Sequence, residues 1–308
     1  MKYYNVQNGP QNVSAIIMGC MRMPALNADE AAKVIETAAD NGINYYDHAT
    51  CYGMGEAEER FGEALAKTSL KREDIFIQSK CGIYPDRQEF NWEKDDILKS
   101  VDGILSRLKT DYLDALLLHR PDLLFEPEEV AEAFDKLESS GKVRHFGVSN
   151  VSPMQLNLLK KCVKQPLVFN QLQLSLDQTQ LIDQELYVNN LTTERSTDRD
   201  NGLLSYCRLN DITIQAWSPL QIGMFGGCFI NHPDYKELND CLAELGEKYN
   251  VSKTAIAIAW ILRHPAHIQV ISGTMNPVHM KEFCDSTKVE LTHNEWYKLY
   301  LASGKFLP

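Results

Sequence analysis

The sequence lacks the long apolar run that a membrane-spanning helix needs. Its longest uninterrupted apolar stretch, residues 255–262, is far shorter than the roughly 20 residues that cross a bilayer. Residues 1–12 are polar and lack the apolar core of a signal peptide. From these absences we expect a cytoplasmic protein that has no membrane partner.

The chain also lacks a surplus of positive charge. Its 308 residues include 31 Lys and Arg against 42 Asp and Glu, so the formal net charge is −11. This charge repels polyanions, and no basic cluster or aromatic stripe indicates a groove for nucleic acid. We therefore expect no nucleic-acid partner. The composition, 44% apolar and 24% charged, is ordinary for a compact globular protein.

Paired motifs for metals and for nucleotide-binding sheets are missing too. The eight cysteines form no C-x-x-C pair, which argues against a zinc ribbon and a dense disulfide framework and favours free thiols. No H-E-x-x-H or paired-histidine metal spacing occurs, so we predict no metal. No G-x-G-x-x-G follows the first expected strand, which argues against a Rossmann domain.

Short β-branched or aromatic runs alternate with segments of helical period along the chain. The predicted strands are residues 14–19, 43–48, 75–80, 113–119, 143–150, 167–171, 213–218 and 268–273. The predicted helices are residues 29–41, 56–67, 95–109, 127–140, 153–164, 199–209, 235–249 with 253–264, and one from 277. A capping-box spacing at Asn27 and Glu30, and prolines at first helical positions, Pro153 and Pro277, support this division.

Eight strand–helix units predict an α/β fold, a closed (β/α)8 TIM barrel in which right-handed crossovers place every helix outside the parallel strands. We expect a single domain over residues 1–308, with a short N-terminal hairpin and a C-terminal helical tail from Thr292. A doubly wound open sheet is the alternative. Residues 177–202 are polar and acidic, and they predict either a long surface loop or a short disrupted helix.

Four residues with useful chemistry end neighbouring strands or follow them. Asp47 ends the second strand and Tyr52 lies in the loop after it, while Lys80 ends the third strand and His119 the fourth. A barrel of this kind builds its active site at the carboxyl ends of the strands, so these side chains should converge. Each alone has an ordinary structural explanation, such as an ion pair or a satisfied buried phenol. Together they suit proton donation to a developing oxyanion.

The four groups predict a division of roles. A phenol has an ordinary pKa of about 10, but a close ammonium favours the phenolate, so Lys80 is expected to lower the pKa of Tyr52. Asp47 would hold Lys80 protonated, and His119 would hydrogen-bond and orient a substrate carbonyl. No side chain supplies a hydride, so reduction requires a cofactor.

These motifs resemble those of the aldo-keto reductase superfamily, whose tetrad matches, in type, order and strand placement, Asp47, Tyr52, Lys80 and His119. Residues 42–52 resemble the family signature G-x-x-x-x-D-T-A-x-x-Y-G, with His48 in place of the commoner Thr. The resemblance covers nearly the whole chain, and residues 295–308 look like a bacterial branch of the superfamily. It implies an NAD(P)H-dependent aldo-keto reductase.

The resemblance also implies a set of cofactor-binding residues, namely Ser149, Asn150, Gln171, Trp217, Ser218, Leu220, Thr274, His279 and Glu282. The first three match positions that meet the nicotinamide carboxamide, and the tryptophan matches the aromatic on which the nicotinamide ring stacks. The next two fall where the backbone wraps the pyrophosphate. The family's habit favours NADP, as NADPH, and NAD is the alternative.

At the adenosine end this sequence departs from the family pattern. The segment 271–280 offers Gly273, Thr274 and His279 where the family often carries a Lys, a Ser or Thr, and an Arg for a 2′-phosphate. Glu282 falls where the family often contacts the adenine, followed by Phe283 in place of the usual Asn.

The sequence therefore predicts an oxidoreductase that transfers a hydride from NAD(P)H to the carbonyl carbon of an aldehyde or ketone, with Tyr52 as proton donor. Its partner would be a small carbonyl substrate. Two alternatives remain open. Lys80 would act as the nucleophile of a Schiff-base lyase if desolvation kept it neutral. The same fold would also serve as a cofactor-binding regulatory subunit of a larger assembly.

Overall fold

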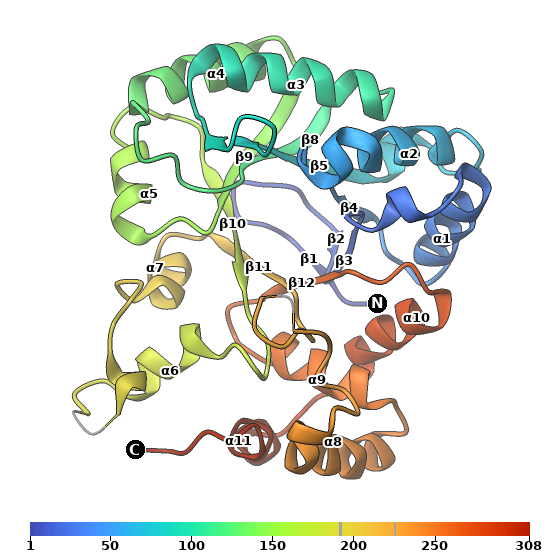
Figure 1. The fold of residues 1–308 in the computed structure, drawn as a ribbon, viewed down its shortest axis with the longest axis vertical. Coiled ribbons are helices and arrows are strands. Elements are labelled where there is room, and N and C mark those ends of the chain that lie inside the picture. Colours follow the sequence, from blue (N-terminus) through green and yellow to red (C-terminus); the bar gives the residue numbers. More distant parts are fainter. Residues whose placement is uncertain (191–192, 225) are drawn as a thin grey trace.

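The computed structural model describes residues 1–190, 193–224 and 226–308. Its centre is a closed barrel of eight parallel strands (Figure 1). The strands are β3 (Ile16–Gly19), β4 (Tyr45–Asp47), β5 (Phe76–Cys81), β8 (Leu113–Leu118), β9 (Val143–Ser149), β10 (Leu167–Gln173), β11 (Thr213–Trp217) and β12 (Gln269–Ser272). Each barrel strand pairs with the next in the chain, and β12 pairs with β3 to close the ring. The predicted barrel is confirmed, and the doubly wound alternative is wrong.

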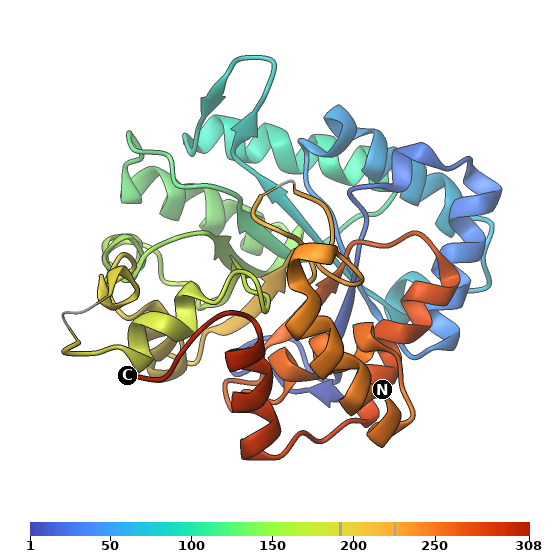
Figure 2. The same cartoon turned by 60° about the horizontal axis from the view of Figure 1, so that its bottom comes forward.

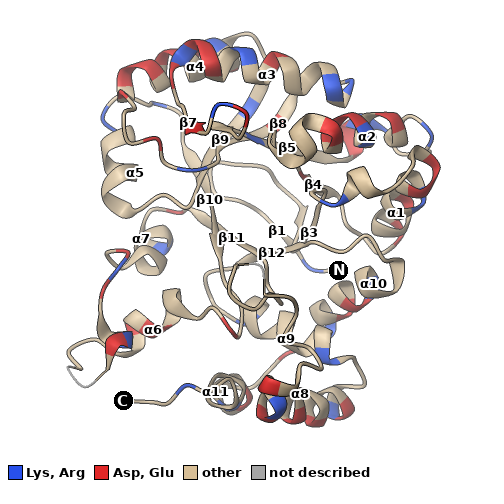
Figure 3. Ribbon diagram, in the orientation of Figure 1, with Lys and Arg blue, Asp and Glu red and all other residues tan. Residues whose placement is uncertain are grey.

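Helices surround the barrel because each crossover returns the chain outside the strands. They are α1 (Ala28–Asp40), α2 (Glu56–Leu65), α3 (Lys94–Leu108), α4 (Pro127–Ser139), α5 (Pro153–Leu159), α7 (Leu203–Leu209), α8 (Lys236–Tyr249), α9 (Lys253–Leu262) and α10 (Pro277–Asp285). Figure 3 shows that charged residues are concentrated on outer helices such as α2, α3, α4 and α8. The long helices are amphipathic, and burying their apolar stripes holds them against the strands.

Helix starts follow the local chemistry of the chain. The Asn27 side chain accepts hydrogen bonds from the backbone N–H groups of Asp29 and Glu30, and Glu30 accepts one from the Asn27 backbone, which confirms the predicted capping box. The helix α7 begins later than predicted, at Leu203. The preceding Asn201 and Gly202 have φ values of 56° and 67°, which a right-handed helix does not contain.

The buried apolar side chains form two separate cores. The larger core lies between the strands and the helices. The smaller core fills the inside of the barrel with side chains that include Val13, Ile17, Tyr45, Ala115, Leu117 and Phe169. Val13 comes from an N-terminal hairpin, β1 (Tyr3–Tyr4) paired antiparallel with β2 (Val13–Ser14), which confirms the predicted hairpin. Because β2 leads directly into β3, the hairpin closes the end of the barrel opposite the strand carboxyl ends.

Two segments gain structure that the sequence left undetermined. After β5 the chain forms an antiparallel hairpin of β6 (Ile83–Tyr84) and β7 (Glu89–Phe90), which projects from the barrel in Figure 2. The segment 177–202 contains the short helix α6 (Gln180–Leu186). Of the two predicted forms, a long surface loop or a short disrupted helix, its described part takes the short helix. Residues 191–192 of that segment lie outside the described residues.

The C-terminal tail is a helix, α11 (His293–Ala302), as predicted. It packs on α9 through the rings of Trp260 and Trp296, which stack with their centres 5.0 Å apart. Each of these indole N–H groups donates to the backbone carbonyl of the other tryptophan, at 3.1 and 3.0 Å. Beyond α11, Lys305 donates to the carbonyl of Leu176 at 2.7 Å, so the chain end is fastened to the loop after β10.

The cysteines and the helix lengths complete the description of the fold. All eight cysteines are free thiols. Within residues 1–190, 193–224 and 226–308, no helix has the length and apolar character needed to cross a bilayer.

Candidate active site

The carboxyl ends of three neighbouring strands bring together the four residues called the tetrad below, Asp47, Tyr52, Lys80 and His119. Asp47 is the last residue of β4, Lys80 lies near the end of β5, and His119 directly follows β8. Tyr52 begins a short turn after β4. The Lys80 nitrogen lies 5.0 Å from the centre of the Tyr52 ring, and the Tyr52 and His119 rings are 5.9 Å apart and nearly perpendicular. The convergence expected from the sequence is present.

Lys80 and Asp47 form a buried ion pair at the base of the tetrad. The Lys80 Nζ lies 2.7 Å from each carboxylate oxygen of Asp47 and 2.7 Å from the carbonyl oxygen of His48. All three ammonium N–H groups have acceptors, which offsets the loss of hydration on burial. An ammonium whose protons are all engaged has no free lone pair, and this argues against Lys80 as a Schiff-base nucleophile.

The predicted lowering of the pKa of Tyr52 by Lys80 is wrong for this structure. Burial raises the pKa of Tyr52 well above its ordinary value, and the negative charge of Asp47 raises it further. The prediction considered the Lys80 ammonium alone, whereas burial of the phenol is the largest cause of the shift and the Asp47 carboxylate acts in the same direction. Tyr52 is therefore a neutral phenol that keeps its proton at neutral pH.

His119 is a neutral imidazole. Burial lowers its pKa well below the ordinary value, and the positive charges of Lys80 and Arg120 lower it further. The Sγ atom of Cys51 lies 3.6 Å from His119 Nδ1, and burial raises the pKa of the Cys51 thiol, so the sulfur keeps its proton. In the tautomer in which the thiol donates to Nδ1, the imidazole carries its own proton on Nε2 and can donate it to an oxygen acceptor.

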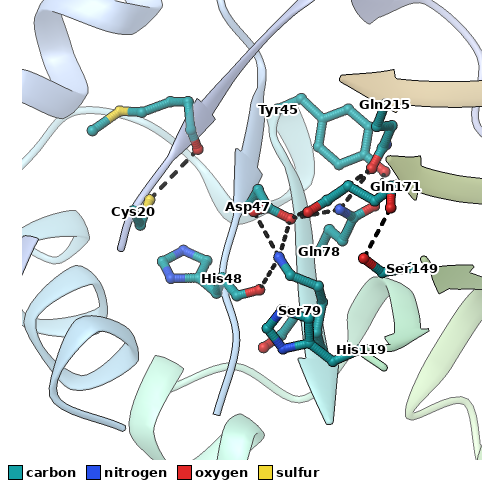
Figure 4. A network of polar contacts seen from close by, with 12 residues as sticks. Cys20, Tyr45, Asp47, His48, Gln78, Ser79, His119, Ser149, Gln171 and Gln215 are labelled. Carbon is teal, nitrogen blue, oxygen red and sulfur yellow. Dashed lines mark hydrogen bonds and ion pairs between the residues drawn. The ribbon is translucent and has the colours of Figure 1, made fainter. Parts of the chain in front are cut away.

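A chain of glutamine side chains crosses the barrel interior beneath the tetrad (Figure 4). Asp47 Oδ1 accepts hydrogen bonds from the side-chain amides of Gln78 at 2.6 Å and Gln171 at 3.0 Å. The same two amides donate to Gln215 Oε1, at 2.9 and 3.2 Å, and Gln215 donates to Gln269 at 3.2 Å. These bonds fix the carboxylate that in turn holds Lys80.

The sequence analysis missed three members of this chain, Gln78, Gln215 and Gln269. A signal was present for the first two, because each lies two residues before a predicted site residue, Lys80 or Trp217. Residues two apart in a strand share a face, so both glutamines had to point into the barrel. A polar residue at such a position is unusual in a core that is otherwise apolar.

Four of the predicted cofactor residues lie beside the tetrad. The Asn150 side-chain amide donates to Ser149 Oγ at 2.8 Å and to the carbonyl of His119 at 3.4 Å. Asn150 Oδ1 accepts from Trp217 Nε1 at 3.2 Å, and Ser149 Oγ donates to the carbonyl of Gln171 at 3.0 Å. Asn150 and Trp217 are part-exposed, whereas Ser149 and Gln171 are buried beneath them. The structure thus brings these four residues and the tetrad to one mouth of the barrel.

The remaining predicted cofactor residues lie on the segments that follow β11 and β12, namely Ser218, Leu220, Thr274, His279 and Glu282. Their described contacts are local. Ser218 Oγ donates to Gln221 at 2.7 Å, and Thr274 Oγ1 accepts from the Asn276 backbone at 3.0 Å. His279 Nδ1 lies 3.0 Å from a Glu282 oxygen, so these two predicted ligands pair with one another. Leu220 packs against the outer core.

Arg22 is a charged residue at this mouth that the sequence analysis missed. It lies in the loop after β3, and its Nη1 donates to the carbonyl of Gly273 at 2.7 Å. A Cβ atom at position 273 would lie 2.6 Å from that nitrogen, so the guanidinium fills the space that a side chain there would take. A cation from the other end of the chain thus lies beside segment 271–280. The predicted closed barrel places β12 beside β3, and from this the loop that contains Arg22 could have been expected to lie near Gly273.

The sequence of this chain is similar to those of known proteins. A sequence profile described as "Aldo/keto reductase family" matches residues 15–300. The chain is 35% identical over 301 residues to an uncharacterized oxidoreductase, YcsN, of Bacillus subtilis, covering 94% of each chain. It is 35% identical over 281 residues to a 6-dehydroglucose reductase of Agrobacterium fabrum, covering 88% of this chain and 87% of the relative.

Solved structures share the same fold. The thermostable aldo-keto reductase Tm1743 aligns with a TM-score of 0.78 and 25% identity, covering 98% of this chain and all of that one. An aldo-keto reductase of Klebsiella pneumoniae in complex with NADPH aligns with a TM-score of 0.77 and 24% identity, covering 97% of this chain and 94% of that one.

Proposed function

We propose that this chain, which belongs to the aldo/keto reductase family, reduces the carbonyl group of an aldehyde or ketone with NADPH. Membership of the family makes it an NAD(P)H-dependent oxidoreductase. The observation that supports the proposal best is the tetrad itself. It presents a neutral phenol and a neutral imidazole, both still protonated, above one buried ion pair. Two uncharged donors suit a carbonyl oxygen that becomes an alkoxide.

Tyr52 is the proton donor in this proposal, and His119 is the second hydrogen-bond donor. Both rings are part-exposed at the barrel mouth, where a carbonyl oxygen can reach them. The proton on His119 Nε2 would hydrogen-bond the carbonyl oxygen and polarise the carbonyl group. The phenol would transfer its proton to the same oxygen as negative charge develops there.

The ion pair acts on the phenolate rather than on the resting phenol. When Tyr52 gives up its proton, the new negative charge lies close to the Lys80 nitrogen, which is 5.0 Å from the ring centre before the transfer. Lys80 stays charged because Asp47 and the glutamine chain hold it. The ammonium would therefore lower the energy of the product state of the proton transfer without ionising the resting phenol.

The residues at the mouth fit a nicotinamide dinucleotide. Asn150 offers a part-exposed side-chain amide, Trp217 offers a part-exposed aromatic ring, and Arg22 places a cation beside Gly273. Asn150 and Ser218 adopt left-handed backbone, with φ values of 58° and 51°, a conformation that costs free energy and is often found at binding sites. When bound, the dinucleotide would supply the hydride. The cation at Arg22 favours NADPH over NADH, because only NADPH carries a 2′-phosphate.

The test is the substitution Tyr52→Phe. It removes one hydroxyl, so turnover of carbonyl substrates should fall by roughly 10²–10⁴-fold, the usual contribution of a general acid, while NADPH affinity stays within about twofold. NADPH oxidation with a panel of aldehydes and ketones measures the first quantity, and quenching of tryptophan fluorescence measures the second.

The same panel separates the regulatory alternative from the enzyme. A wild-type protein that binds NADPH tightly but oxidises none of it with any carbonyl compound would favour a cofactor-binding subunit. Undiminished turnover by Tyr52→Phe would remove Tyr52 as the proton donor and leave the reductase itself standing.

A further inference from the structure

Arg120 is a part-buried cation at the barrel mouth that the proposed mechanism does not use. It directly follows His119 at the end of β8. Its charge is one of the causes that lower the pKa of His119, so the guanidinium is electrostatically close to the imidazole. Its central carbon lies 5.9 Å from the centre of the Trp217 ring. Arg120 therefore stands between a tetrad residue and the aromatic side of the mouth.

No described residue neutralises this charge. Asp122, the nearest acid in sequence, uses its oxygens on backbone N–H groups, of Trp92 at 3.0 Å and of Leu124 at 2.8 Å. Burial lowers the pKa of Arg120, and no acidic neighbour opposes that effect. Arg120 thus carries its charge partly desolvated and without a counter-ion in the described part of the chain.

The other partly buried arginines contrast with it. Each has an oxygen partner in the described structure, in the pairs Arg60 with Glu63, Arg72 with Asp114, Arg107 with Glu58, Arg195 with Asp183, and Arg263 with the carbonyl of Leu291. Leaving a guanidinium partly desolvated and unpaired costs free energy, and the cost is offset when a ligand supplies the missing anion.

We propose that Arg120 binds an anionic group of the carbonyl substrate, so that this protein prefers aldehydes or ketones that also carry a carboxylate or a comparable anion. The inference rests on the proposed function, because it places the reacting carbonyl at Tyr52 and His119. A planar carboxylate matches the fork of N–H donors that a guanidinium presents. Arg120 is then a residue that determines substrate specificity, and it takes no part in the proton transfer.

The experiment compares 4-carboxybenzaldehyde with methyl 4-formylbenzoate, its uncharged methyl ester. It measures kcat/KM for both in the wild type and in Arg120→Gln, Arg120→Lys and Arg208→Gln. Arg208 is exposed on α7, so its substitution controls for the loss of one positive charge. We expect Arg120→Gln to lower kcat/KM for the acid by about 10- to 100-fold, the usual weight of a charge-assisted hydrogen bond, and that for the ester by less than threefold. Arg120→Lys should keep part of the preference.

Two further measurements make the result decisive. Cofactor affinity is titrated in each variant, because an equal loss of NADPH affinity in Arg120→Gln would show that Arg120 serves the cofactor and would overturn the proposal. Equal losses for acid and ester would also overturn it. Binding of benzoate and of benzamide to the NADPH-loaded protein is measured by calorimetry. If no carbonyl compound is reduced, yet benzoate binds and Arg120→Gln abolishes that binding, the proposed function fails while the anion site stands.

Discussion

The two ends of the barrel interior are built from opposite kinds of side chain. The end nearest the N-terminal hairpin is filled by apolar residues, among them Val13, Ile17 and Phe169. The carboxyl end holds an ion pair, Lys80 with Asp47, and a chain of glutamines. Both ends are buried, so burial alone does not make the difference. The comparison teaches that one end is free to maximise packing, while the other gives up packing to hold a charge next to a phenol.

The largest effect is expected at the polar end, from Asp47→Asn. This substitution keeps the shape of the side chain but leaves the buried Lys80 ammonium without its counter-ion. We expect the free energy of unfolding to fall by about 3–5 kcal/mol, the usual cost of breaking a buried ion pair on one side. Carbonyl reduction should fall by roughly a hundredfold or more as well, because the site loses its general-acid geometry. Urea unfolding and steady-state kinetics measure the two losses.

The control for Asp47→Asn is the double variant Asp47→Asn with Lys80→Met. Removing both charges should restore most of the stability, since no buried charge is then left without a counter-ion. It should not restore turnover. A double variant as active as the wild type would make the ion pair a purely structural feature and would erase the contrast between the two ends.

The next effect in size is expected at the apolar end, from Ile17→Ala. The truncation leaves a cavity in the barrel interior, and we expect a loss of about 2–5 kcal/mol in the free energy of unfolding. Turnover per folded molecule should stay within about threefold of the wild type. Leu158→Ala on α5, where the side chain is 41% exposed, is the matched control and should cost much less. A large drop in turnover without unfolding would mean that the apolar end also serves the chemistry.

The smallest effect is expected at the rim, from Arg22→Gln. Loss of this cation should weaken NADPH binding by about tenfold, or about 1.4 kcal/mol, and leave NADH binding and stability almost unchanged. Fluorescence titration with the two dinucleotides measures the ratio, and Lys33→Gln on the exposed face of α1 serves as the control. An equal loss of affinity for NADPH and NADH would show that Arg22 contacts a part of the dinucleotide other than the 2′-phosphate.

The strands and the tetrad could be predicted from the sequence because both depend on local patterns. Apolar runs of strand length ended in Asp47, Lys80 and His119, and parallel strands bring such ends to one face. The hairpin β6–β7 could not be predicted, since its two strands are each only two residues long. Arg22 was missed because its partner, Gly273, is close only after the ring of strands has closed.

The direction of the Tyr52 pKa shift could not be read from the sequence either. The residue types present, a lysine and a phenol, were right, but the sign depends first on how deeply the phenol is buried and then on the negative charge of Asp47 beside it. The depth of burial of one ring at the barrel mouth is a property of the folded site, and no spacing along a chain encodes it.

The hydrogen bond between Arg22 and Gly273 constrains the order in which parts of the chain fold. Its partners are 251 residues apart, and it crosses the joint where β3 meets β12. A chain growing on the ribosome has no such joint until its last strand has emerged, because almost the entire polypeptide forms the loop that must close first. The corner proposed to hold the phosphate therefore cannot form before the barrel has closed. Tight binding of NADPH would then mark a chain whose barrel is complete.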